Sequence, residues 1–202
     1  MLSAKNHGFP LLATNAKMVL GWVSSPQTGA PVGISEIREG IASSRSLGEE
    51  RLVPWLLGLL SDAELAAGDP NAAAEAANEA LRWGEENNLY TLYGYLHRTR
   101  GDAMVALGDL AQAEEDYHRA LVWSRGRNEK WGELNAALRL ARLWQADGRA
   151  GDARDLLAPV YGWFTEGFDN PVLRDAKALL DELTGTFDSG AVSDWAADPR
   201  NN

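Results

Sequence analysis

The sequence predicts an all-α protein in which consecutive helical hairpins stack side by side as a right-handed superhelical solenoid. The first observation behind this fold class is self-similarity, because residues 68–83, 108–123 and 148–163 share one pattern at a constant offset of 40 residues. The second is that the repeated positions are three and four residues apart, as on one face of a helix. The third is that no segment alternates with the two-residue period of a half-buried strand. Repeats of about this length are typical of stacked helical units.

The repeated positions explain how two helices of a hairpin pack together. Two of every three positions hold small residues, which allow helices to approach each other to about 8–10 Å. A further small position recurs in the preceding helix, so each repeat is expected to be two antiparallel helices that meet through small residues. The first set is Gly33, Ala73, Ala113 and Ala153; the second is Ile37, Ala77, Tyr117 and Leu157; the third is Gly40, Ala80, Ala120 and Val160; the set in the preceding helix is Gly21, Ser61, Gly101 and Ala141.

Helix-terminal residues divide the chain into repeats. Gly68, Gly108 and Gly148 follow helical patterns, where a left-handed residue caps a helix C-terminus. The pair Asp69-Pro70 supplies an N-cap acceptor and a first-turn proline, and Pro54 is expected in the first turn of its helix. We therefore predict one repeat domain over residues 1–184, with hairpins at about 9–47, 48–87, 88–127 and 128–168.

The C-terminal end of the predicted solenoid needs a cap, because a last hairpin without one exposes an apolar face. Residues 170–184 begin with Asn170-Pro171 and carry an apolar stripe that includes Leu179, Leu180 and Leu183, so we predict a capping helix there. Trp83, Trp123 and Trp163 share one repeat position, which favours core packing for all three. Residues 185–202 lose the periodicity and are predicted to form a mobile tail.

Composition excludes several classes of function. The chain is 45% hydrophobic and 24% charged, with no cysteine, which rules out disulfides, thiolate nucleophiles and cysteine zinc sites. A net charge of −10 without a basic cluster argues against nucleic-acid binding. No signal peptide and no long apolar run is recognised, so we expect a cytoplasmic protein that contacts no membrane.

Catalytic chemistry is also not expected. His7, His97 and His118 fit no metal-ligand motif, and the acids of residues 114–116 are interpreted as surface charge. There is no nucleophilic Gly-x-Ser-x-Gly and no phosphate-binding loop with a lysine. We predict no catalytic residue, no metal and no cofactor.

One stretch carries a recognisable motif. Gly101, Gly108, Ala113, Tyr117 and Ala120 follow the spacing of the tetratricopeptide skeleton, although the repeat here is longer than the usual 34 or so residues. Residues 138–183 and 95–109 resemble the C-terminal repeat region of a bacterial family of class III adenylate/guanylate cyclases and signal-transduction ATPase regulators. The resemblance covers residues 7–184 and none of the catalytic domains that those relatives carry upstream.

The resemblance implies a non-catalytic module that regulates a cyclase or ATPase by binding a peptide or a partner protein. Two alternatives remain, a small-molecule sensor and a homotypic assembly module that use the same inner groove. In tetratricopeptide relatives the first helix of each hairpin lines this groove. Projecting the repeat onto the chain gives these candidate groove residues: Asn15, Trp55, Tyr95 and Asn135 in one row, Arg98 and Leu138 in a second, and Asp62, Asp102 and Arg142 in a third.

The N-terminal end is expected to lack a cap. Phe9, Leu11, Leu12 and Val19 would meet an upstream repeat in longer relatives, so we expect this apolar face to be hidden by self-association. A homodimer that uses the same patch twice is the simplest arrangement.

Overall fold

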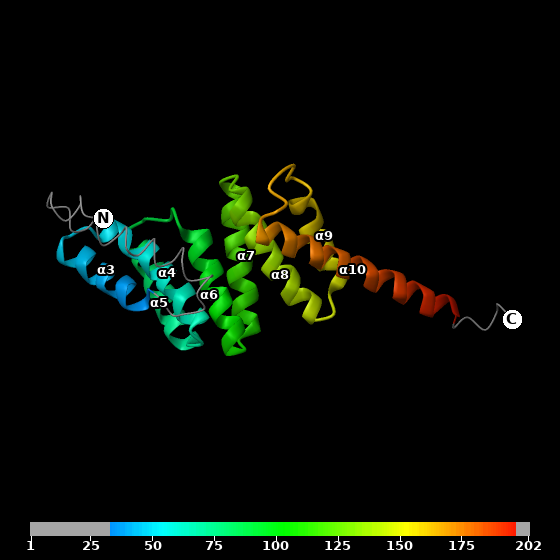
Figure 1. The fold of residues 1–202 in the computed structure, drawn as a ribbon, viewed down its shortest axis with the longest axis horizontal. Helices are drawn as coiled ribbons and strands as arrows, with labels where there is room; N and C mark the ends of the chain where they lie inside the picture. Colours follow the sequence, from blue (N-terminus) through cyan, green and yellow to red (C-terminus); the bar gives the residue numbers. More distant parts are fainter. Residues whose placement is uncertain (1–32, 197–202) are drawn as a thin grey trace. The chain divides into compact units, whose positions relative to one another are not determined.

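The structure, a computed structural model, describes residues 33–196, and the side chains of residues 33–185. Every regular element in this part of the chain is helical, as the sequence predicts (Figure 1). The elements in chain order are α3 (Ile34–Ser46), the short 3₁₀ helix η1 (Glu50–Leu52), α4 (Val53–Ala66), α5 (Pro70–Glu86), α6 (Tyr93–Leu107), α7 (Leu110–Gly126), α8 (Lys130–Ala146), α9 (Ala150–Tyr161) and α10 (Pro171–Ala196).

The chain divides into two compact units, Met1–Asp116 and Tyr117–Asn202, with the division inside α7. In unit 1, α4 packs against α3, α5 and α6, and α5 also packs against α6. In unit 2, α8, α9 and α10 all contact one another. Helices that follow each other along the chain therefore pack as neighbours in each unit. The single domain expected over residues 1–184 stays a prediction.

Left-handed residues end the helices at a constant interval of twenty residues. Gly48, Gly68, Gly108 and Gly148 have φ between 71° and 85°, and Asn88 and Asn128 have φ of 52° and 58°. After Gly68, the amide of Asp69 donates to the carbonyl of Glu64 at 2.9 Å, which satisfies an orphan carbonyl at the end of α4. Asparagine takes this conformation more readily than other side chains, which explains its use at the two joints without glycine.

The small repeated positions lie at helix contacts, as predicted. Ala73, Ala113 and Ala153 are each 0% exposed, and Ala80 and Ala120 are 0% and 1% exposed. The larger residues between them are buried as well, and so are the small residues of the preceding helices. These are Ile37, Ala77, Tyr117 and Leu157 in the first group and Ser61, Gly101 and Ala141 in the second.

Helix α9 ends one turn earlier than its counterparts, which corrects the prediction for Trp163. It has 12 residues, whereas α5 and α7 have 17 each. Pro159 lies inside α9, and Gly162 caps it, so Trp163 leaves the helical frame and is 57% exposed. Trp83 and Trp123 remain on their helices and are half-buried. The packing role predicted for this repeated tryptophan position is therefore wrong at Trp163.

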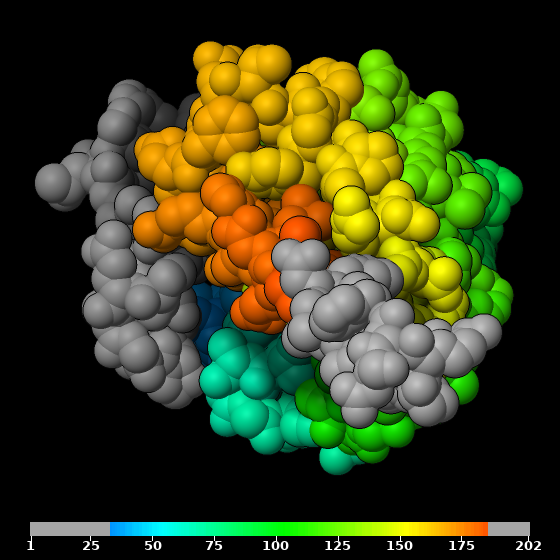
Figure 2. Space-filling view, turned by 90° about the vertical axis from the view of Figure 1, so that its right-hand side faces the viewer, coloured from blue at the N-terminus to red at the C-terminus, as the bar shows by residue number. Residues whose placement is uncertain are grey.

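Helix α10 begins where the capping helix was predicted and continues further. Asn170 caps it, because its side-chain oxygen accepts a hydrogen bond from the amide of Val172 at 2.9 Å. Leu173, Ala176, Leu179 and Leu183 are buried, and the residues of α10 lie against α9 within unit 2 (Figure 2). The predicted end at residue 184 is wrong, because α10 extends to Ala196. No proline interrupts the chain before Pro199, so the helix propagates through Gly185 once its first turns are anchored.

Candidate functional site

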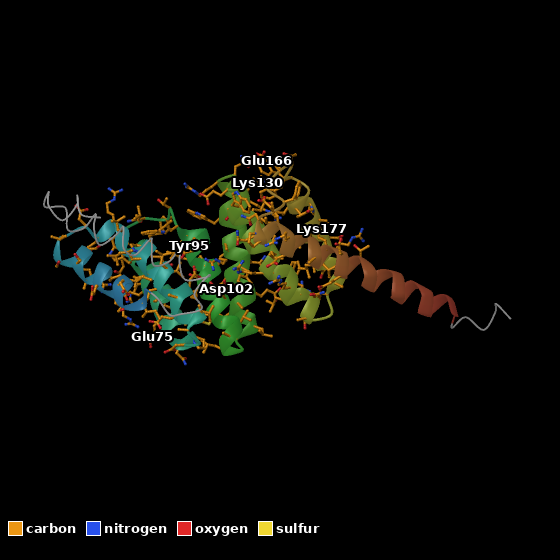
Figure 3. All side chains as sticks on the ribbon, viewed as in Figure 1. Glu75, Tyr95, Asp102, Lys130, Glu166 and Lys177 are labelled. Carbon is orange, nitrogen blue, oxygen red and sulfur yellow. The ribbon has the colours of Figure 1, made fainter. Side chains whose placement is uncertain are left out.

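Four of the predicted groove residues come together on α4 and α6 in unit 1. We call Asp62, Tyr95, Arg98 and Asp102 the polar cluster; Figure 3 labels Tyr95 and Asp102. Arg98 donates from Nη1 to Asp62 Oδ1 at 2.9 Å and from Nη2 to Asp62 Oδ2 at 3.1 Å. Its Nη1 also donates to Asp102 Oδ2 at 2.9 Å, and the Tyr95 hydroxyl donates to Asp62 Oδ2 at 2.9 Å. The Arg98 guanidinium of α6 thus binds the Asp62 carboxylate of α4 through two hydrogen bonds, which joins the two helices.

The side chains of the polar cluster hold one another in place and remain partly exposed. The side chains of Asp62, Arg98 and Asp102 are 26%, 15% and 16% exposed. The Arg98 guanidinium carbon also lies 4.9 Å from the centre of the Tyr95 ring, as in a cation–π contact. Side chains held in this way have little rotamer entropy left to lose when a ligand binds.

Electrostatics favour recognition over proton transfer at the polar cluster. Burial and the neighbouring Asp62 carboxylate raise the pKa of the Tyr95 hydroxyl above its ordinary value. Burial by itself would lower the pKa of Arg98, but the carboxylates of Asp62 and Asp102 outweigh it and raise that pKa. Tyr95 therefore stays a neutral donor and Arg98 a cation throughout the physiological range, so neither group is suited to general acid–base catalysis.

Gly58 determines where Tyr95 lies, and sequence reasoning missed it. A Cβ on Gly58 would fall 2.3 Å from Tyr95 Cε1 and 3.1 Å from Leu96 Cδ2. The absence of a side chain on α4 at this position is what allows the Tyr95 ring to rest on α4 and reach Asp62. A glycine inside a helix is otherwise unfavourable, so an isolated glycine in α4 was the signal that could have revealed it.

We expect Gly58→Ala to destabilise the protein by about 1–3 kcal/mol, as overpacking does in dense cores. Helix propensity alone predicts the opposite sign, a gain of about 1 kcal/mol. Urea unfolding followed by circular dichroism measures the difference. Gly126→Ala is the matched control, because a Cβ there meets no atom within 4 Å. If Gly58→Ala is as stable as the control, Tyr95 is not seated by Gly58.

The other predicted groove residues have contacts of their own within each unit. In unit 1, Trp55 is half-buried and packs against the hydrophobic core formed by α3, α4, α5 and α6. In unit 2, the Asn135 side chain donates to the carbonyl of Trp131 at 2.9 Å, one turn back on α8. Asn15 lies outside the described residues, as does the patch around Phe9 for which a homodimer was expected.

Two further predicted residues of unit 2 have local structural partners. Leu138 is only 3% exposed, so its side chain contributes to packing and offers no surface to a ligand, which corrects its assignment to the groove. The helical period predicts on which face of the helix Leu138 lies, but it does not predict whether a neighbouring helix buries that position. Arg142 lies 3.4 Å from Asp175 of α10, and its side chain is 54% exposed.

A second polar network lies between α6 and α7 and is buried. His97 Nδ1 lies 2.7 Å from Asp116 Oδ1, and these two side chains are 1% and 0% exposed. Arg100 donates to both Asp116 oxygens, from Nη2 at 2.6 Å and from Nε at 2.8 Å. Because a carboxylate only accepts, His97 Nδ1 carries the proton of this hydrogen bond. Its Nε2 is buried with no hydrogen-bond partner among the described residues.

Asp116 corrects the interpretation of residues 114–116 as surface charge. Burial alone would raise the pKa of its carboxyl, but the hydrogen bonds from His97 and Arg100 and the charge of Arg100 hold that pKa below its ordinary value. Asp116 is three residues after Ala113 and four before Ala120, which is the spacing of the buried helix face. This spacing in the sequence predicts that Asp116 is buried.

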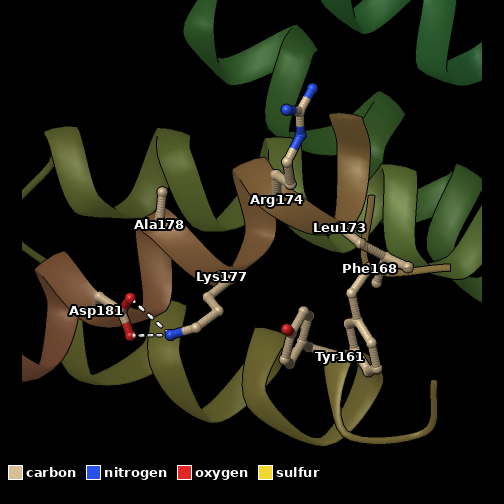
Figure 4. Close-up of a pocket in the computed structure, with 7 residues that line it drawn as sticks. All are labelled: Tyr161, Phe168, Leu173, Arg174, Lys177, Ala178 and Asp181. Atoms are coloured by element: carbon tan, nitrogen blue, oxygen red, sulfur yellow. Dashed lines mark hydrogen bonds and ion pairs between the residues drawn. The ribbon is translucent and has the colours of Figure 1, made fainter. Parts of the chain in front are cut away.

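Unit 2 contains an open pocket of about 280 Å³ at the start of α10 (Figure 4). The rings of Tyr161 and Phe168 form one wall, with centres 6.0 Å apart. Lys177 contacts both carboxylate oxygens of Asp181, at 2.9 Å and 2.8 Å. The charged lining and open mouth differ from the deep enclosed pocket with few polar groups that a small-molecule sensor would need.

Comparison with solved structures identifies the fold. Crystal structures of nearly identical TPR-like repeats, from a Podosopora anserina protein named as a kinesin light chain, superpose on this chain with a TM-score of 0.68 at 15% identity. The match covers 88% of this chain and 88% of that one. A second structure of those repeats, with one substitution, gives a TM-score of 0.69 at 14% identity and covers 88% and 87% of the two chains. The fold is that of TPR-like repeats.

Sequence comparison adds no relative. No protein-family model matches the sequence, and no curated protein matches it. Within the described residues, no helix is long and apolar enough to cross a membrane. In the same part of the chain, no group of three histidine or carboxylate side chains is placed to hold a metal ion.

Proposed function

We propose that this chain is a non-catalytic interaction module that binds an extended peptide or a flexible segment of a partner protein on the α4–α6 face of unit 1. The observation that carries the proposal is the polar cluster. Four residues chosen from the repeat pattern as groove residues are joined on two neighbouring helices and stay partly exposed.

The chemistry of the polar cluster fits a peptide. It combines one guanidinium, two carboxylates and a phenol, and therefore has a net charge of about −1 at neutral pH. Carboxylates accept hydrogen bonds from backbone amides and from lysine or arginine side chains, whereas they repel phosphate groups. The exposed fractions leave room for such donors, and the preformed geometry lowers the entropy cost of binding.

Selection from a random peptide library displayed on phage, followed by fluorescence anisotropy with the selected peptides, tests this function. We expect Tyr95→Phe to raise the Kd about fivefold, because Asp62 loses the hydroxyl that holds it in place, an effect of about 1 kcal/mol. Arg98→Lys keeps the charge but loses the planar fork, and we expect an effect of at least this size.

The control for this experiment is Glu75→Gln on α5, because Glu75 is exposed and lies outside the polar cluster (Figure 3). We expect it to leave the Kd unchanged within about twofold. If the Kd of the selected peptides changes with Glu75→Gln but with neither Tyr95→Phe nor Arg98→Lys, the peptides bind elsewhere on the protein. A library that yields no binder would contradict peptide recognition.

We also propose that the module belongs to a bacterial signalling protein and regulates its cyclase or ATPase domain from the cytoplasm. The resemblance of residues 95–109 and 138–183 to the C-terminal repeats of those proteins supports this context. The genomic reading frame upstream of Met1 tests it. A cyclase domain or a phosphate-binding loop is expected there, and a frame that encodes neither contradicts the signalling context without affecting the peptide proposal.

A further inference from the structure

An exposed group of aromatic rings lies in unit 2 and has no role in the peptide site of unit 1. Trp131 at the start of α8 is 46% exposed, Trp163 is 57% exposed and Phe168 is 46% exposed. Phe164 links two of them, because its ring centre lies 5.2 Å from that of Trp131 and 5.1 Å from that of Trp163. We call Trp131, Trp163 and Phe164 the aromatic surface. Large apolar rings exposed together are typical of interaction sites.

Backbone geometry keeps these rings at the surface. Pro159 and Gly162 end α9 before Trp163, and Asn170 caps the next helix, so residues 162–170 form an irregular connection. Gly167 within it has φ +77°, a conformation that strains other residues. The connection therefore cannot continue α9, and its rings stay outside the helix packing of unit 2.

The charges on this connection have one sign. Residues 162–170 contain Glu166 and Asp169 and no basic residue. Both carboxylates are exposed, and neither takes part in a hydrogen bond or ion pair with another residue of the described chain. The whole chain also has a net charge of −10, which attracts cationic partners and repels anionic ones.

The aromatic surface already holds one cation. Lys130 Nζ lies 5.8 Å from the centre of the Trp163 ring while it contacts Glu133 Oε2 at 2.8 Å. Figure 3 labels Lys130 on α8 and Glu166 on the connection. The Lys130 ammonium group thus contacts both an indole ring and a carboxylate. A cation of a partner would make the same kind of contact here.

We propose that the aromatic surface is a second docking site, which binds a lysine- or arginine-containing segment of a partner protein. Cationic side chains of that segment lie over the exposed rings of Trp131 and Trp163, and Glu166 and Asp169 pair with their charges. The combination of rings and unpaired carboxylates favours arginine over lysine, because a guanidinium both stacks on rings and binds carboxylates through its planar fork.

Fluorescence anisotropy with a labelled peptide of glycine, serine and several arginines, about twelve residues long, tests this site. We expect Trp163→Ala to raise the Kd about fivefold with no change in net charge, and Trp163→Phe to restore most of the affinity. Glu166→Gln is expected to raise the Kd about threefold. Circular dichroism checks that each variant is folded, which the exposure of both side chains favours.

The matched control is again Glu75→Gln, which removes the same charge from unit 1 and is expected to change the Kd less than twofold. Equal effects of Glu75→Gln and Glu166→Gln, or no effect of Trp163→Ala, would show attraction by net charge alone and overturn the proposal. Absence of binding would overturn it as well. Sedimentation in which Trp163→Ala dissociates a dimer would assign the surface to a second copy of this chain instead. Tyr95→Phe should leave this affinity unchanged, which separates the site from the polar cluster.

Discussion

Replacing Asp116 with asparagine is expected to lower the free energy of unfolding by about 3 kcal/mol at neutral pH. The carboxylate is 0% exposed and accepts hydrogen bonds from His97 and Arg100. Asparagine has nearly the same shape but no charge, so the Arg100 guanidinium loses its counterion and a hydrogen-bonded buried pair is broken. Urea unfolding at pH 7 measures the loss.

The pH dependence of this loss has a definite sign. The folded-state pKa of Asp116 lies below its ordinary value, so its stabilisation is present above the unfolded-state pKa of about 3.9 and disappears as the pH falls through the folded-state pKa. The stability difference between the wild type and Asp116→Asn should therefore narrow below about pH 4. Asp155→Asn, at an exposed position of α9, should change stability by less than about 0.5 kcal/mol. A loss at Asp116 no larger than this would contradict the buried network.

Truncation of Leu183 should weaken the cap that α10 forms over α8 and α9. Leu183 is 0% exposed, and replacing a leucine at such a site with alanine costs about 2–5 kcal/mol, because the cavity refills only in part. We expect Leu183→Ala to lower the melting temperature clearly and to increase binding of an apolar dye. Thermal unfolding followed by circular dichroism and dye fluorescence measures both effects.

Leu180 provides the matched control for the cap, since it lies on the same helix but is half-buried. Leu179 and Leu180 both belong to the apolar stripe from which the capping helix is predicted, and Leu179 is 3% exposed. Leu180→Ala is therefore expected to cost about 1 kcal/mol, roughly in proportion to the apolar area it covers. Equal losses for the two leucine variants would mean that α10 does not cover unit 2 through the predicted face.

The sequence by itself determined the helical fold. Small residues at a constant interval have a simple physical meaning, because two helices can approach closely only where neither has a large side chain. The same holds for the helix ends, where Gly68, Gly108 and Gly148 take the left-handed conformation that the pattern predicts. The repeat pattern of the sequence also selected Asp62, Tyr95, Arg98 and Asp102 as residues of one predicted surface.

The tertiary structure decided what periodicity could not express. A repeat frame assigns a face to each residue but not the depth to which a neighbour covers it, so it placed buried Leu138 in the groove. The repeat frame also assumes that corresponding helices have the same length. Helix α9 ends early, at Pro159 and Gly162, and this leaves Trp163 exposed. Gly58 seats Tyr95 through a contact between α4 and α6 that are far apart in sequence. Burial, helix length and close approach depend on which side chains from other helices fill the same space, and that is settled only when the hairpins pack.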